Sequence, residues 1–224
     1  TSIKPEISKR LDSGDEGVQG DIKDAFLIFV QISLFLYLVM SLFSKEIVQL
    51  LMNEKFHECY KIVPIFLLSI IFSEATGIFQ LKFVFKNQTI WFPVTLFFSA
   101  LLNVVLNYFL IPGLNVYGAA LAKTVTEILL FGLTFVIAQR LHKTDYGLRQ
   151  NFWPLLSVIA LVYFMDTLSV AWGYLLALKF GTVLFYGLVL DLLLARSSRR
   201  YGEVRKMAMT IFSVKMKKIR MLVP

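Results

Sequence analysis

Residues 90–111 read IWFPVTLFFSALLNVVLNYFLI, an apolar run without a charged side chain. A helix needs about 20 such residues to cross a hydrocarbon core of about 30 Å. Five other runs of similar length are also apolar nearly all round rather than on one face, which is the pattern that lipid requires. The sequence therefore predicts an all-α, polytopic membrane bundle of six transmembrane helices, over residues 25–43, 63–81, 90–111, 116–139, 153–171 and 172–195.

The composition agrees with this prediction. Of the 224 residues, 57% are apolar and 17% are charged, whereas an average soluble domain has about 45–50% and about 25%. The net charge of +8 needs no nucleic acid partner, because anionic lipids and topology signals account for excess Lys and Arg in a membrane protein. The lone cysteine, Cys59, excludes an intrachain disulfide.

Lys and Arg gather in alternate flanks of the predicted spans. Most of them lie at residues 1–24, 82–89, 140–152 and 196–224. The opposite flanks carry only Lys45, Lys55 and Lys61, all in the long outer connection 44–62. Because cytoplasmic loops carry the excess of Lys and Arg, both ends of the chain are predicted to be cytoplasmic. We therefore expect a multi-pass membrane protein.

Two polar segments flank the bundle. Residues 1–24 are predicted to be a cytoplasmic loop, and a chain that begins at Thr1 rather than Met is expected to be a fragment or a processed product. Residues 196–224 combine helically spaced apolar residues with many cations, which predicts a basic amphipathic tail on anionic inner-leaflet lipids. Recognition of a specific phospholipid or of a soluble partner is the alternative for this tail.

Four polar side chains fall at similar depths inside neighbouring predicted spans, and they are Glu74, Asn103, Lys123 and Glu127; Asn107 shares the helix face of Asn103. A charged residue at mid-membrane costs at least about 2.5–3.5 kcal/mol, so such residues avoid lipid. The two asparagines are four residues apart, as are Lys123 and Glu127, and each pair therefore shares a helix face. Two readings remain open: a buried network that holds helices together, or a hydrophilic cavity for a polar substrate or a coupling ion.

The remaining polar residues indicate little chemistry. Asp166 and Lys179 lie at similar depths in the last two spans and are interpreted as a structural pair. His57 and Cys59 lack the partners that a metal site needs, and phosphate-binding loops and catalytic motifs are missing from the sequence. No catalytic residue, metal or cofactor is therefore expected, and the chain is not expected to be an enzyme.

One stretch is more specific than the others. LNVVLNYFLIP (102–112) is followed closely by GAALA (118–122), and the chain opens with PEISKRL (5–11) and a Gly-Asp pair at 14–15. These segments resemble the polysaccharide flippases, the Wzx-like exporters of O-antigen (lipopolysaccharide), teichoic acid and capsule repeat units. That family belongs to the multidrug/oligosaccharidyl-lipid/polysaccharide exporter superfamily. The resemblance covers most of residues 1–140.

The resemblance implies the later part of a two-lobed transporter of a bacterial or archaeal cytoplasmic (inner) membrane, whose N-terminal lobe is a missing partner. Such flippases move undecaprenyl-diphosphate-linked oligosaccharide across the membrane by alternating access. Lys123 stands where the family usually has Thr or a small residue, and Asn115 where Gly is common. By this resemblance Lys123 offsets diphosphate charge in the cavity, and Glu74 or Glu127 carries a coupling ion.

Three other functions remain open. A drug/cation antiporter of the same superfamily would favour acidic cavity residues without a dominant lysine. An integral-membrane polysaccharide ligase or polymerase would need catalytic residues in a large outer loop, and the connection 44–62 shows no such set. A membrane scaffold would use the intramembrane charges only to join helices.

Overall fold

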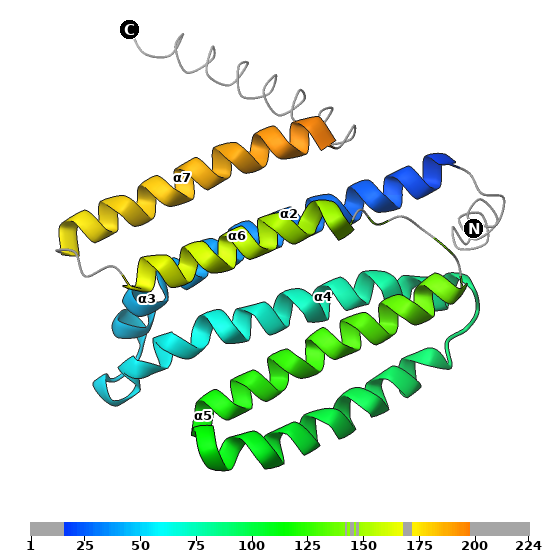
Figure 1. The fold of residues 1–224 in the computed structure, drawn as a ribbon, viewed down its shortest axis with the longest axis horizontal. Coiled ribbons are helices and arrows are strands. Elements are labelled where there is room, and N and C mark those ends of the chain that lie inside the picture. Colours follow the sequence, from blue (N-terminus) through cyan, green and yellow to red (C-terminus); the bar gives the residue numbers. More distant parts are fainter. Residues whose placement is uncertain (1–15, 142, 144–145, 147, 168–171, 198–224) are drawn as a thin grey trace, which may run out of the picture.

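The computed structural model describes residues 16–141, 143, 146, 148–167 and 172–197, and every regular element in this part of the chain is helical (Figure 1). Helices cover most of each predicted span. The predicted loop 1–24, the tail 196–224 and the turn near residue 171 lie largely outside the described residues. In chain order the elements are α2 Glu16–Leu42, α3 Ser44–Leu51, the 3-10 helix η1 Glu54–Ile62, α4 Val63–Phe85, α5 Trp91–Leu141, α6 Leu148–Thr167 and α7 Trp172–Ser197.

The helices form a flat bundle in which α4 lies between α2 and α5 (Figure 1). The core between them is aromatic: Phe79 of α4 contacts the rings of Phe26, Phe131 and Tyr146, with centroids 4.7–5.5 Å apart. Such ring pairs contribute about 0.5–1.5 kcal/mol beyond the area that they bury. The α4–α5 contact, which includes Lys123 and Glu127, therefore rests on a rigid aromatic core.

Three helices of the described residues are long and apolar enough to cross a membrane: Glu54–Val84, Trp91–Leu141 and Tyr174–Leu192. A bent pair, Phe26–Leu42 with Ser44–Leu51, makes a fourth if it counts as one span, since its halves meet at 59°. The helix Trp153–Met165 is apolar but shorter. These helices make the protein polytopic, and the count of six crossings stays a prediction.

Helix α5 is a helical hairpin rather than one rod. Its two arms lie side by side and meet at Asn115, whose φ of 49° and ψ of −125° are non-helical (Figure 1). These angles are close to those of the first central residue of a type II′ turn, a position that favours glycine. The two predicted spans 90–111 and 116–139 are thus the two arms, and the chain reverses at Asn115 after passing Pro112 in helical conformation.

A single glycine permits the close approach of the two arms. A Cβ atom on Gly118 would lie 2.3 Å from the carbonyl oxygen of Leu110 and 2.9 Å from the backbone nitrogen of Ile111. No other residue type fits there without moving the backbone. The glycine that opens the GAALA segment therefore sets the geometry of the hairpin.

The other end of the hairpin joins α4 through a tight helix cap. The N–H of Gln88 donates to the carbonyl of Phe83 at 2.8 Å, and the N–H of Asn87 donates to that of Val84 at 3.2 Å. Asn87 itself has a φ of 54°. This is the Schellman pattern, with Asn in the left-handed position that usually holds Gly. The cap starts the first arm of α5 a few residues after α4 ends.

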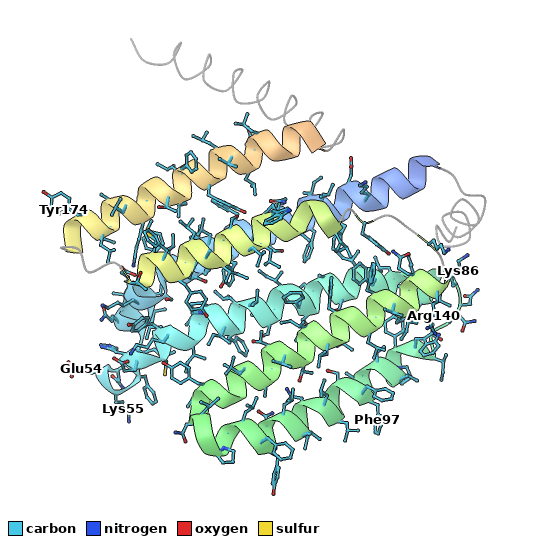
Figure 2. All side chains as sticks on the ribbon, viewed as in Figure 1. Glu54, Lys55, Lys86, Phe97, Arg140 and Tyr174 are labelled. Atoms are coloured by element: carbon cyan, nitrogen blue, oxygen red, sulfur yellow. The ribbon has the colours of Figure 1, made fainter. Side chains whose placement is uncertain are left out.

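The predicted outer connection 44–62 is ordered. It forms α3, which begins directly after the bend at Phe43, and then the 3-10 helix η1. Pro64 occupies the first turn of α4, where its missing N–H costs no hydrogen bond. Lys86 and Arg140 lie at one end of the bundle, and Glu54, Lys55 and Tyr174 lie at the opposite end (Figure 2).

Candidate polar site on the α5 hairpin

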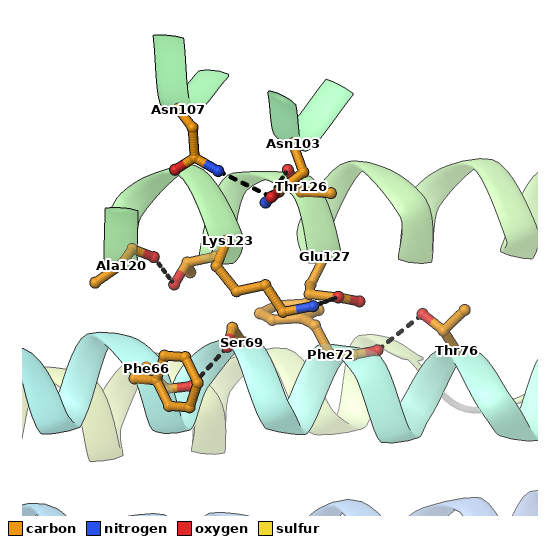
Figure 3. Close-up of polar contacts among 11 residues, drawn as sticks. Phe66, Ser69, Phe72, Thr76, Asn103, Asn107, Ala120, Lys123, Thr126 and Glu127 are labelled. Carbon is orange, nitrogen blue, oxygen red and sulfur yellow. Dashed lines mark hydrogen bonds and ion pairs between the residues drawn. The ribbon is translucent and has the colours of Figure 1, made fainter. Parts of the chain in front are cut away.

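Four of the five candidate site residues belong to the α5 hairpin, and side-chain hydrogen bonds join its two arms. On the first arm, Asn107 Nδ2 donates to Asn103 Oδ1 at 2.9 Å. Asn103 Nδ2 in turn donates to Thr126 Oγ1 on the second arm at 3.4 Å. Thr126 is fully buried, so this hydrogen bond lies within the contact between the arms. We call Asn103, Asn107, Lys123, Thr126 and Glu127 the hairpin cluster (Figure 3).

Lys123 and Glu127 form an ion pair along the second arm (Figure 3). The two members differ in environment: the side chain of Lys123 is 44% exposed, whereas that of Glu127 is 4% exposed. Removing the lysine would leave a buried carboxylate without its counter-charge. Lys123 thus supplies the counter-charge of the buried Glu127 carboxylate, while part of the lysine side chain is exposed.

Two buried oxygen atoms of the cluster accept no hydrogen bond from the described residues. They are Glu127 Oε2 and Asn107 Oδ1. Buried polar atoms are normally paired, so each unpaired one calls for an explanation. Here the two acceptors lie on different arms of the hairpin: the Glu127 oxygen belongs to the ion pair with Lys123, whose side chain is partly exposed, and the Asn107 oxygen belongs to the asparagine pair of the first arm. Each arm can therefore offer an acceptor to a polar ligand, and the second arm adds a cation.

Helix α4 forms the adjoining wall of the cluster. Thr124 Oγ1 donates to the carbonyls of Ile65 and Ala120, both at 2.9 Å, and so fixes the second arm against α4. Ser69 and Thr76 donate to carbonyls of their own helix (Figure 3). The hydroxyl groups on this wall are thus satisfied locally and do not pair with the cluster.

Glu74 lies on an exposed face of α4, outside the hydrogen bonds and the ion pair of the hairpin cluster. It is two residues from Phe72, whose ring makes an edge-to-face contact with Phe131 of α5. Residues two apart point to opposite sides of a helix, so the Glu74 side chain points away from this contact. Its convergence with the other candidate residues at one depth in the membrane stays a prediction.

Asp166 and Lys179 were predicted to form a structural pair, and of the two the structure describes only the side chain of Lys179. Lys179 of α7 is buried and donates to Glu46 Oε1 of α3 at 2.6 Å. Lys179 therefore forms an ion pair with a residue of the outer connection 44–62. The side chain of Asp166 lies outside the described residues, so its pairing with Lys179 stays a prediction.

Lys82 was predicted to lie in a cytoplasmic flank, and the structure shows it as a buried cation. It is 4% exposed, and its Nζ lies 3.5 Å from the carbonyl oxygen of Ala138 and 4.8 Å from the centroid of the Tyr146 ring. Burial raises the pKa of the Tyr146 hydroxyl, which stays neutral. In the sequence, the only sign that Lys82 is buried is its place three positions before the end of an apolar run. The groups that it contacts, Ala138 and Tyr146, lie far along the chain and could not be identified from this pattern.

The described residues provide no metal site: no three His, Cys, Asp or Glu side chains among them lie close enough to hold an ion. His57 Nε2 contacts only the carbonyl of Met52, at 3.1 Å. The arrangement is thus a polytopic helical bundle with a polar cluster between helices, an architecture that membrane transporters have.

Comparison with known families identifies the transporter. The sequence model described as "Lipid II flippase MurJ" matches residues 1–212. The chain therefore belongs to the lipid II flippase MurJ family, a family of cytoplasmic-membrane transporters for lipid-linked cell-envelope precursors. No curated protein and no solved structure matches the chain. The match confirms a flippase of the expected superfamily and does not show the Wzx-like branch.

Proposed function

We propose that this chain is the later part of a two-lobed flippase that moves an undecaprenyl-diphosphate-linked saccharide across the cytoplasmic membrane by alternating access. The observation that carries the proposal is the hairpin cluster, in which the partly exposed side chain of Lys123 is paired with the buried Glu127, and two buried oxygen atoms accept no hydrogen bond from the described residues. A scaffold that used its charges only to join helices would need neither an exposed lysine side chain nor unpaired buried acceptors. Family membership supports the same class of cargo.

In this proposal each member of the cluster has a role. Lys123 offsets the charge of the diphosphate as the head group crosses. Glu127 keeps the ammonium group in place, and the asparagines present amide groups to the saccharide. Because Glu127 is already paired with Lys123, the exposed Glu74 is the better candidate to carry a coupling proton or Na⁺.

The family name favours lipid II, a cell-wall precursor, as the cargo. The motifs in residues 102–122 equally fit a lipid-linked O-antigen, teichoic acid or capsule repeat unit, which makes such units the second candidate. Both cargos share the diphosphate and the lipid tail. The chemistry proposed for Lys123 therefore applies to either one.

The proposed topology places both ends of the chain in the cytoplasm. Lys86 and Arg140 lie at the end of the bundle assigned to the cytoplasmic side, and Glu54 and Lys55 lie at the outer end (Figure 2). The basic tail 196–224 is proposed to lie on anionic inner-leaflet lipids. The missing N-terminal lobe would cover the hairpin cluster.

The test uses the intact parent gene under a repressible promoter. After depletion, the proposal predicts that lipid-linked precursors accumulate in the inner leaflet, and that wild type but not Lys123→Met restores export. Separate measurement of lipid II and of lipid-linked repeat units identifies the cargo. Unchanged precursor distribution together with altered drug sensitivity would contradict the proposal and favour the drug/cation antiporter.

A further inference from the structure

A pocket with several polar lining residues lies at the end of the bundle where α2 ends and α7 begins, outside the hairpin cluster. Its volume is about 380 Å³, and α2, α3, η1, α4, α6, α7 and the turn of α5 all contribute to its walls. Small-molecule pockets commonly have volumes of about 300–1,000 Å³. The convergence of so many elements at one pocket makes it a feature of the tertiary fold rather than of one loop.

Three lysines line the pocket: Lys45, Lys61 and Lys179. None of its lining residues in the described part of the chain is Asp or Glu. The convergence is notable because the outer flanks are poor in cations and supply only Lys45, Lys55 and Lys61. Two of these three meet the intramembrane Lys179 in one place.

The lysines are unequally neutralised. Lys179 is paired with Glu46, and Lys61 with Glu58. Lys45 forms no ion pair in the described part of the chain, and its ammonium group lies 5.8 Å from the centroid of the Tyr60 ring. The pocket therefore keeps a positive charge.

The two outer-flank lysines are also available to a ligand. Lys45 is exposed, and the Lys61–Glu58 pair is exposed at 44% and 79%. Exposed ion pairs contribute only about 0–1 kcal/mol, so Lys61 can exchange its partner for a stronger anion at little cost. Lys179 differs, because it is buried and holds α7 to α3.

Three tyrosines complete the lining: Tyr60, Tyr117 and Tyr163. A phenol hydroxyl donates hydrogen bonds, and tyrosine concentrates at the level of lipid head groups. Lysine and tyrosine together supply charge and directed donors to phosphate oxygens. The charge of the lysines favours an anionic group over a neutral sugar, for which the hydroxyl groups of the lining would be enough.

We propose that this pocket binds the phosphate of a lipid head group at the outer face of the membrane. The bound lipid is either the diphosphate-linked lipid arriving in the outer leaflet or an anionic phospholipid. The first source rests on the proposed function, whereas the second does not. Lys45 and Lys61 contact the phosphate, and Lys179 positions α7 beside them.

The test measures equilibrium binding to the purified full-length protein in neutral detergent. Three probes separate the sources: a polyprenyl diphosphate, phosphatidylglycerol and inorganic pyrophosphate. Lys45→Gln removes a pocket lysine without breaking an ion pair. Lys55→Gln is the matched control, because Lys55 is an outer-flank lysine that does not line the pocket. Loss of one charged hydrogen bond predicts about tenfold weaker binding for Lys45→Gln and no change for Lys55→Gln.

Each outcome decides the proposal. Tighter binding of the polyprenyl diphosphate than of the other probes, with dependence on Lys45, identifies the cargo lipid as the ligand. Equal Lys45-dependent binding of phosphatidylglycerol identifies a general head-group site, and this result holds even if the transport proposal fails. Equal Lys45-dependent binding of pyrophosphate identifies the phosphate group alone as what is recognised. Absence of binding for all three probes, or equal effects of the two substitutions, would overturn the proposal.

Discussion

The substitution Gly118→Ala tests the geometry of the α5 hairpin directly. The added Cβ would lie 2.3 Å and 2.6 Å from the carbonyl oxygen and carbon of Leu110, whereas carbon atoms in contact stay about 3.5–4.0 Å apart. Both neighbours are backbone atoms, which cannot rotate away as a side chain can. The arms must therefore separate at the turn.

The magnitude follows from two opposing effects. Overpacking costs about 1–3 kcal/mol, and contact with backbone places this site at the upper end of that range. Replacing glycine by alanine within a helix contributes about 0.5–1 kcal/mol in the favourable direction. We therefore expect Gly118→Ala to lower the free energy of unfolding by about 2 kcal/mol.

Gly113→Ala is the matched control, since it adds the same methyl group to the same hairpin with no atom within 4 Å. It should be neutral or slightly stabilising. The assay is denaturant unfolding of both variants of the full-length protein in mixed micelles, followed by helical circular dichroism. If Gly118→Ala unfolds within about 0.5 kcal/mol of Gly113→Ala, the close approach of the arms is wrong.

Three further substitutions test other contacts. Asn115→Gly should stabilise the protein by up to about 1 kcal/mol in the same unfolding assay, because glycine adopts the positive φ of 49° without strain; a loss of stability would contradict the turn geometry. Lys179→Met leaves Glu46 without its ion pair, so a loss of about 1–3 kcal/mol in the free energy of unfolding is expected. The double variant with Glu46→Gln should recover part of this loss, whereas additive losses would show that the pair is not coupled. Lys123→Met should lower the free energy of unfolding by about 3 kcal/mol or more, because it leaves the buried Glu127 carboxylate without its counter-charge. The double variant Lys123→Met/Glu127→Gln should regain stability but not export. Restored export would show that the ammonium group has no role in transport.

The helices and the local pairs were predictable from sequence because both depend on short-range spacing. Apolar runs long enough for a membrane became α4, α7 and the arms of α5. The spacing of four residues placed Asn103 beside Asn107 and Lys123 beside Glu127, and both pairs are hydrogen-bonded. No tertiary information is needed for such contacts, because the helix itself brings the side chains together.

Contacts between helices could not be predicted in the same way. Counting residues predicts a depth for Glu74, but the face that it occupies depends on how α4 packs against α5. Thr126 joins the cluster only because the turn sets the register of the two arms. The Lys179–Glu46 pair connects residues 133 positions apart, and one of them lies in a connection that was expected to be a loop.

The most direct test of the account is photo-crosslinking from the hairpin cluster in living cells. A photoreactive amino acid replaces Asn107 in the full-length protein, and the control position is Phe109, which is 71% exposed and points to the opposite side of the same arm. The account predicts a covalent adduct with a diphosphate-linked saccharide lipid from position 107 and none from position 109. Equal labelling from both positions, or adducts with phospholipid alone at position 107, would contradict the claim that this cluster faces the path of the transported lipid.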